Sequence, residues 1–299
     1  NRPEFQRRMP QEFWREVVER VAAEAPDTLL LAEAFWLMEG YFVRSLGMHR
    51  VYNSAFMNML KAEDNRGFRT LIKNTLEFDP QILKRYVNFL NNPDEETAIA
   101  QFGTGDKYFG VCLLMATLPG LPMFGHGQVE GLREKYGMEY RRAYVEEGPD
   151  EELIRRHERE IFPLLRRRHL FAEVEHFRLF DLFTHQGVVN EDVFAYSNRA
   201  GGERVLILYN NRYADARGWL RRSAAFLRPG SPGAPGEAPA QGGLVQEELG
   251  QALGLSAEPG VFCRFREVIG GLEFLRPARD LHERGLYVEL GAYRFQAFL

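Results

Sequence analysis

The sequence predicts an α/β region over residues 1–172, followed by an all-β domain of sandwich type over residues 173–299. In the first region, short apolar runs without alternation separate helical patterns. Such runs are typical of strands buried on both faces of a parallel sheet. Beyond about residue 172, short strand patterns follow one another across Gly, Asn and Asp turns, which indicates an antiparallel region.

The composition argues against several classes of partner. The 299 residues are 45% apolar and carry a net charge of -4, so the composition does not predict a basic surface that would bind nucleic acid. No apolar run approaches the roughly 20 residues of a membrane span, and no signal-peptide pattern opens the chain. Cys112 and Cys263 lie far apart in apolar surroundings, as reduced thiols do. The compartment stays open, although these features favour the cytoplasm.

The chain opens with a helix and a buried strand. Pro10 suits the first turn of the helix, and residues 28–32 (TLLLA) form the strand because they carry no charge and do not alternate. An apolar stripe with helical spacing runs through Phe13, Val17, Val18 and Val21. The sequence therefore begins in the helical half of a β–α unit, with no strand in front. We expect a loop with exposed aromatic side chains between this strand and Gly47.

Three further strands are predicted at residues 49–53, 86–90 and 120–124. Helical patterns lie between them: one capped by Ser54, one through Phe68 and Leu76, one starting at Asp79-Pro80, and one over residues 108–118. Strands that alternate with helices predict a parallel sheet with right-handed crossovers.

A charged helix over residues 150–169 precedes the all-β domain, and its arginine run at 166–168 is expected to be a solvated last turn. The strands predicted in the all-β domain cover residues 177–183, 193–196, 205–209, 261–265, 286–290 and 293–299. Residues 228–243 are rich in Pro, Gly and Ala and are interpreted as a flexible insert.

Glu33 directly follows the first strand and is the first candidate for chemistry. A carboxylate at the carboxyl end of a parallel strand points into the mouth of the sheet, where active sites lie. Phe35 and Trp36 beside it would exclude water and raise its pKa, which favours a proton donor. The structural alternative is a carboxylate that caps a helix or pairs with an arginine.

Other polar residues follow the later strands. Asp94 follows the third strand, and His126 and Gln128 follow the fourth, so parallel strands would bring them to the same rim as Glu33. Carboxylates at such a rim suit cleavage of a sugar acetal, because the reaction develops an oxocarbenium-like centre and needs one protonated carboxyl. Metal binding is the competing use, but the histidines lack zinc-type spacing and no EF-hand loop is present. We therefore predict no metal site in this chain.

At this point the residues resemble glycoside hydrolase family 13, the α-amylase family of (β/α)8 barrels. Residues 29–36 look like the fifth-strand motif, which ends in the acid/base glutamate, and residues 89–94 (FLNNPD) are similar to the Asn-His-Asp motif of the seventh strand. Residues 120–122 (GLP), with Gly127 and Glu130, resemble the motif after the eighth strand. The resemblance covers nearly the whole chain in the right order.

The resemblance implies the second half of a (β/α)8 barrel, strands five to eight, followed by the C-terminal β-sandwich. It implies that Glu33 is the general acid/base and that Asp94 orients the sugar hydroxyls and stabilises the transition state. Trp36, Asn92 and His126 would contact substrate, although packing for Trp36 and loop hydrogen bonds for His126 stay open. The sequence departs from the family in two places: Pro93 replaces the motif histidine, and Glu130 stands one residue late.

In the family, the nucleophilic aspartate and its arginine partner end the fourth strand, which would precede this chain. We therefore expect the C-terminal part of a longer hydrolase or transglycosylase acting on α-linked glucose polymers or oligosaccharides, inactive alone. An upstream barrel half or self-association would cover the exposed sheet edges. No cofactor is expected in this chain, and any calcium site would lie in the missing half. The alternative is a non-catalytic carbohydrate-binding or regulatory protein on the same scaffold.

Overall fold

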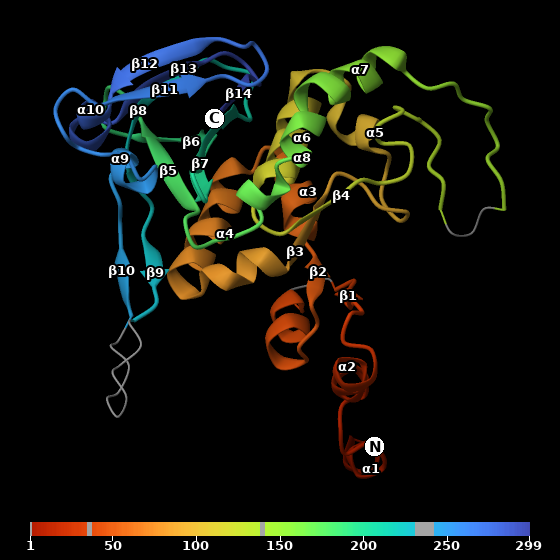
Figure 1. Ribbon diagram of the computed structural model, residues 1–299. Helices are drawn as coiled ribbons and strands as arrows, with labels where there is room; N and C mark the ends of the chain where they lie inside the picture. Colours follow the sequence, from red (N-terminus) through yellow and green to blue (C-terminus); the bar gives the residue numbers. More distant parts are fainter. Residues whose placement is uncertain (1, 35–37, 138–140, 231–241) are drawn as a thin grey trace, which may run out of the picture.

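The computed structural model of the chain describes residues 2–34, 38–137, 141–230 and 242–299. A parallel sheet with its helices leads into a larger antiparallel sheet, and an N-terminal helical arm projects from the body (Figure 1). Among the described residues, no helix is both long enough and apolar enough to cross a membrane.

The parallel sheet contains the four predicted strands in chain order, and all its pairings are parallel. The strands are β1 (Leu31–Ala32), β2 (Arg50–Tyr52), β3 (Tyr86–Phe89) and β4 (Leu121–Met123). The first strand is shorter than the predicted 28–32. In the described part of the chain β1 pairs only with β2, and Leu29 and Leu31 are exposed, so the outer edge of β1 lacks the hydrogen bonds that would extend it.

Helices precede and connect these strands. They are α1 (Arg2–Arg8), α2 (Phe13–Glu24), the π-helix η1 (Tyr41–Ser45), α3 (Ser54–Ala62), α4 (Asn65–Phe78), the 3-10 helix η2 (Pro80–Arg85), α5 (Ala98–Phe102) and α6 (Asp106–Thr117). The loop predicted up to Gly47 is therefore wrong where η1 forms. The cap predicted at Ser54 is also wrong, because the Asn53 side chain accepts from the Phe56 N–H at 3.3 Å and Ser54 is already helical.

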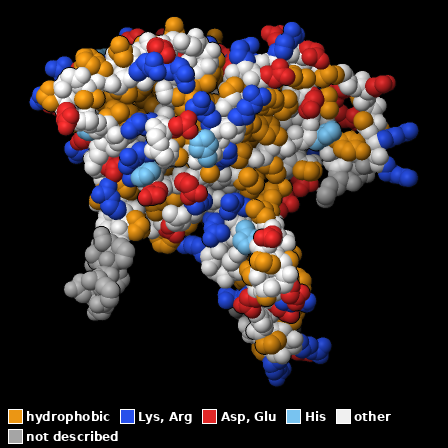
Figure 2. Space-filling model, viewed as in Figure 1, with side chains coloured by type: hydrophobic (Ala, Val, Ile, Leu, Met, Phe, Trp, Pro, Cys, Tyr) orange, Lys and Arg blue, Asp and Glu red, His pale blue; other side chains and the backbone are white. Residues whose placement is uncertain are grey.

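The N-terminal arm carries apolar side chains on its surface. Phe5, Phe13 and Trp14 are exposed, although α2 has the predicted apolar stripe. Figure 2 shows hydrophobic and charged side chains along the projecting arm.

The charged helix predicted over 150–169 is broken into α7 (Glu151–Glu160), α8 (Phe162–Leu165) and the 3-10 turn η3 (Arg168–Leu170). Pro163 lies in the first turn of α8, where it provides no N–H to continue the preceding helix. Arg168 is half-buried and not solvated as predicted. Its guanidinium donates to the carbonyls of Ala116 and Leu118 at 2.9 and 3.0 Å, which lack helical partners at the end of α6.

The antiparallel sheet has six strands in the order β13-β8-β5-β6-β7-β14. Their bounds are β5 (Arg178–Phe183), β6 (Val189–Ala200), β7 (Glu203–Asn210), β8 (Ala216–Ser223), β13 (Leu286–Leu290) and β14 (Phe295–Phe298). A ribbon of β11 (Phe262–Arg266) and β12 (Glu273–Pro277), a hairpin of β9 (Phe226–Arg228) and β10 (Gly243–Val245), and the short helices α9 (Leu249–Ala252) and α10 (Ala278–Glu283) complete the region. The ends of the predicted insert form β9 and β10, while residues 231–241 lie outside the described residues.

Both faces of the antiparallel sheet are buried at its centre. Along β6, Phe194 and Tyr196 point into the core shared with the helices, whereas Val193 and Ala195 point into a second core. The second core includes side chains of the β11–β12 ribbon and of α9 and α10. This two-sided burial explains why residues 193–196 of β6 and 205–209 of β7 form continuous apolar runs.

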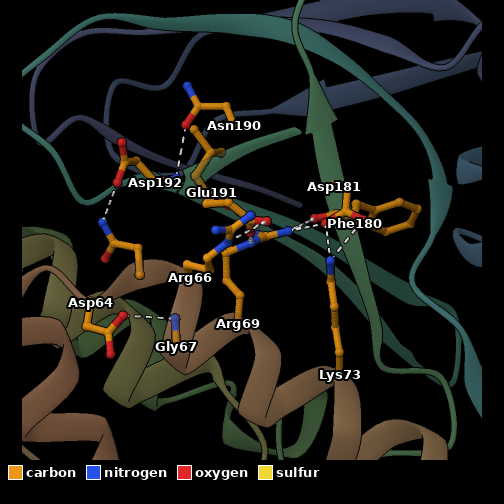
Figure 3. A network of polar contacts seen from close by, with 12 residues as sticks. Asp64, Arg66, Gly67, Arg69, Lys73, Phe180, Asp181, Asn190, Glu191 and Asp192 are labelled. Carbon is orange, nitrogen blue, oxygen red and sulfur yellow. Dashed lines mark hydrogen bonds and ion pairs between the residues drawn. The ribbon is translucent and has the colours of Figure 1, made fainter. Parts of the chain in front are cut away.

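Helix α4 is joined to the antiparallel sheet by a polar network around Arg69 (Figure 3). Arg69 is fully buried, and its Nε donates to Glu191 at 3.0 Å. Its terminal nitrogens donate to Asp181 and to the Phe180 carbonyl, and Lys73 pairs with Asp181 at 2.8 Å. Burial of this guanidinium is tolerated because acceptors on β5 and β6 satisfy its nitrogens.

Candidate active site

Glu33 lies just after β1, and local alternation exposes its side chain. Ala32 and Ala34 on either side are buried in a small cluster with Met48 and Val51. Because successive side chains of an extended chain point to opposite faces, Glu33 is directed away from this cluster. It is exposed at the carboxyl end of β1.

Asp94 is held in a turn that follows β3. The Asn92 side-chain oxygen accepts hydrogen bonds from the N–H groups of Asp94 and Glu95, both at 3.0 Å. Lys135 donates to the Asp94 carbonyl at 2.7 Å, while the Asp94 side chain is exposed. Asn92 itself is buried, and its side-chain oxygen shapes this turn. Its Nδ2 has no hydrogen-bond partner among the described residues, and the substrate contact expected from the sequence stays a prediction.

The charge of Asp94 acts on Glu33. The pKa of Glu33 is raised, first by the partial desolvation of this largely exposed carboxyl and then by the negative charge of Asp94. Burial, followed by the charges of Glu33 and Asp94, also raises the pKa of Tyr52 at the end of β2. Because β1 and β3 belong to one parallel sheet, the carboxyl groups that follow them lie at the same rim, with Tyr52 at the end of β2 between these strands.

Tyr52 was not predicted as a site residue from the sequence, although its position at the end of a predicted strand could have indicated it. It is the last residue of β2, so it occupies the same end of the sheet as Glu33. Its ring packs against Phe89 at the end of β3, with centroids 5.1 Å apart. A hydroxyl-bearing aromatic at a strand end is a group that can both stack and hydrogen-bond.

His126 and Gln128 follow β4 and differ in exposure. His126 is exposed, and its ring lies 5.7 Å from that of Tyr136, on a small pocket that Asn92 also lines. Gln128 is buried, and its side-chain oxygen accepts from the Gly125 N–H at 3.1 Å. Gln128 thus holds the loop that presents His126. Trp36, the remaining predicted contact, lies outside the described residues.

A buried layer supports this loop from below. The Tyr108 hydroxyl donates to the Gln128 carbonyl at 2.7 Å and lies 2.9 Å from His157 Nε2. Burial raises the pKa of Tyr108 and lowers that of His157 to about 4, so both groups are neutral near pH 7. Hydrogen bonds between neutral groups therefore fix the base of the loop.

The described residues offer no group of three or more His, Cys, Asp and Glu side chains arranged to hold a metal ion. The rim of the parallel sheet that carries Glu33, Tyr52 and Asp94 is called the acidic rim below. It combines two carboxyl groups with aromatic and polar neighbours, and this arrangement can provide a proton donor beside a negative charge.

Solved structures with a similar fold include the α-amylase of Anoxybacillus, with a TM-score of 0.61 and 16% identity over 96% of this chain and 55% of that one. The α-amylase of Geobacillus thermoleovorans, complexed with acarbose, has a TM-score of 0.64 and 15% identity over 96% of this chain and 56% of that one. The debranching enzyme of Nostoc punctiforme has a TM-score of 0.60 and 15% identity over 96% and 54%.

No protein-family model and no curated protein matches the sequence. The chain spans little more than half the length of the solved structures named above, 54–56%. At 15–16% identity these likenesses concern the fold. The chain therefore shares the fold of the corresponding part of these two α-amylases and of this debranching enzyme.

Proposed function

We propose that this chain is part of a retaining glycosidase or transglycosylase that acts on α-linked glucose polymers or oligosaccharides. The observation that carries the proposal is the position of Glu33 and Asp94 after two strands of one parallel sheet, where desolvation and then the charge of Asp94 raise the pKa of Glu33. A raised pKa favours the protonated form of the Glu33 carboxyl, the form that would donate a proton to the leaving glycosidic oxygen. Once ionised, Glu33 would act as the base that activates water or an acceptor hydroxyl.

Asp94 has a different task in this mechanism. Its negative charge beside the reacting centre would stabilise the oxocarbenium-like transition state. Lys135 and Asn92 bind the backbone of its turn and so leave the Asp94 carboxylate available for sugar hydroxyls. Tyr52 supplies an aromatic surface between the two carboxyl groups.

The nucleophile of a retaining reaction must lie about 5 Å from the acid. We propose that it belongs to a segment that also completes a (β/α)8 barrel around β1–β4. Three exposed apolar residues, Leu29 just before β1, Leu31 on β1 and Leu121 on β4, support this proposal, because an added strand on each side would bury them. The proposed reaction needs no cofactor bound to this chain, and we propose that any calcium site lies in the added segment.

The substrate class rests on the similar proteins. One is an α-amylase complexed with acarbose, and another is a cyclomaltodextrinase that matches 70% of this chain with a TM-score of 0.54 and 21% identity. The rim of this chain carries groups suited to the same substrates. We therefore take maltooligosaccharides as the test substrates.

The test is turnover by the protein extended with the region encoded upstream. Glu33→Gln should lower kcat about 10²- to 10⁴-fold, the usual contribution of general acid–base catalysis, while oligosaccharide binding persists. Glu24→Gln, a change in an exposed glutamate at the end of α2, is the matched control and should leave kcat unchanged.

Three results would change this view. Unaltered turnover in Glu33→Gln would remove Glu33 from the mechanism. Binding without any turnover in the extended protein would favour the non-catalytic carbohydrate-binding alternative. Robust hydrolysis by the 299-residue chain alone would contradict the external nucleophile.

A further inference from the structure

A cavity of about 570 Å³ lies away from the acidic rim. It is lined by residues of the α4–η2 junction, by residues 173–178 and by strand β9. Helix η2 leads into the amino end of β3, whereas Asp94 follows the carboxyl end of the same strand. The cavity is therefore separate from the candidate active site, and its volume falls within the range of small-molecule sites.

Three arginines and the carboxylate of Glu247 line the wall of this cavity. Arg178 and Glu247 are both buried and pair at 2.7 Å, and Arg228 pairs with the other oxygen of Glu247 at 2.6 Å. The Arg178 guanidinium also lies 3.7 Å above the Phe226 ring. Both oxygens of Glu247 are thus engaged by guanidinium groups.

The third arginine, Arg199, forms no ion pair with a carboxylate in the described part of the chain. It is half-buried, and its Nε is shielded from water without a hydrogen-bond partner among the described residues. It lies close enough for its charge to lower the pKa of both Glu247 and Arg178. The cluster of Arg178, Arg199, Arg228 and Glu247 therefore has an excess of two positive charges.

The other charged groups of the wall do not offset this excess at close range. Lys84 and Glu173 pair with each other, and Asp79 caps η2 through the Gln81 N–H. Glu175 is exposed. The pKa of His176 is lowered, first by burial and then by the charge of Arg199, which keeps this histidine neutral near pH 7.

We propose that this cavity binds a small organic phosphate, with the phosphate group on Arg199 and Arg228. Guanidinium groups bind phosphate oxygens through paired, charge-assisted hydrogen bonds. A phosphate monoester carries close to two negative charges near pH 7, which matches the excess in the cluster. A cavity of about 570 Å³ also has room for the organic part, beside the polar groups of Gln81 and Lys84. The proposal does not depend on glycosidase activity.

The experiment is isothermal titration calorimetry of the 299-residue chain with glucose 6-phosphate, inorganic phosphate and glucose. Glucose 6-phosphate should bind more tightly than inorganic phosphate, and glucose should not bind. Arg199→Gln should weaken binding of the sugar phosphate at least about tenfold, because a charge-assisted hydrogen bond is lost. Arg217→Gln, a change in an exposed arginine of β8 outside the cavity, is the control and should bind like the wild type.

Thermal unfolding of each variant verifies that it is folded. If Arg199→Gln does not fold, Arg199→Lys replaces it; this variant keeps the charge but loses the planar fork, and should still bind more weakly than the wild type. The proposal is overturned if no phosphate compound binds, or if the Arg199 variants bind with unchanged affinity. Equal affinity for inorganic phosphate and glucose 6-phosphate would refute the organic ligand.

Discussion

Replacing Arg69 should reveal how strongly helix α4 is tied to the antiparallel sheet. Arg69→Met keeps a long apolar stem but removes the guanidinium, leaving Asp181 and Glu191 without their buried partner. Breaking a buried ion pair from one side costs about 3–5 kcal/mol. Because the side chains of Asp181 and Glu191 keep 18% and 30% exposure, water offsets part of the loss. We therefore expect about 3 kcal/mol, the lower end of that range.

The measurement is thermal unfolding followed by circular dichroism. At about 2–4 °C per kcal/mol, the value for domains of 150–250 residues, Tm should fall by about 6–12 °C. Arg66→Met is the matched control on the same helix, since the Arg66 side chain is 81% exposed and lies 3.9 Å from Glu191. That change should cost less than about 1 kcal/mol, as exposed ion pairs do. Equal Tm values for the two variants would refute the role assigned to the Arg69 network.

Three other changes test the core and the rim. Gly110→Ala should lower Tm, since the added Cβ would lie 1.9 Å from the Tyr209 ring and overpacking costs about 1–3 kcal/mol; a wild-type Tm would show that the ring yields. The pKa of His157 is lowered by burial to about 4, so stability should be full above about pH 6.5, the unfolded value, and should decline as the pH falls toward 4. His157→Gln should flatten that decline, and an identical Tm–pH curve would contradict the assignment. Asp94→Asn should lower the pKa of Glu33, measured by carboxyl-carbon NMR, because a neighbouring charge is removed; an unshifted pKa would show that the two groups do not interact.

The strands that carry the rim could be predicted because short apolar runs between turn residues mark them in the local sequence. Residues 86–90 and 120–124 are short apolar runs bounded by turn residues, and the structure forms β3 and β4 there. Strand β8 was missed for the converse reason. It carries Arg217, Arg221 and Arg222 at exposed positions, so its apolar residues are too sparse to mark a strand without its neighbours.

The sequence by itself determined the order of the four strands of the parallel sheet and the place of Glu33 and Asp94 after two of them, because periodicity and turn residues act over a few neighbours. Only the tertiary structure decided that the charge of Asp94 reaches Glu33, which lies 61 positions away in the chain (94 - 33). It also decided that Arg69 is buried, since its acceptors lie 111 to 124 residues further along. Electrostatic and burial effects depend on distance in space, and folding alone sets that distance.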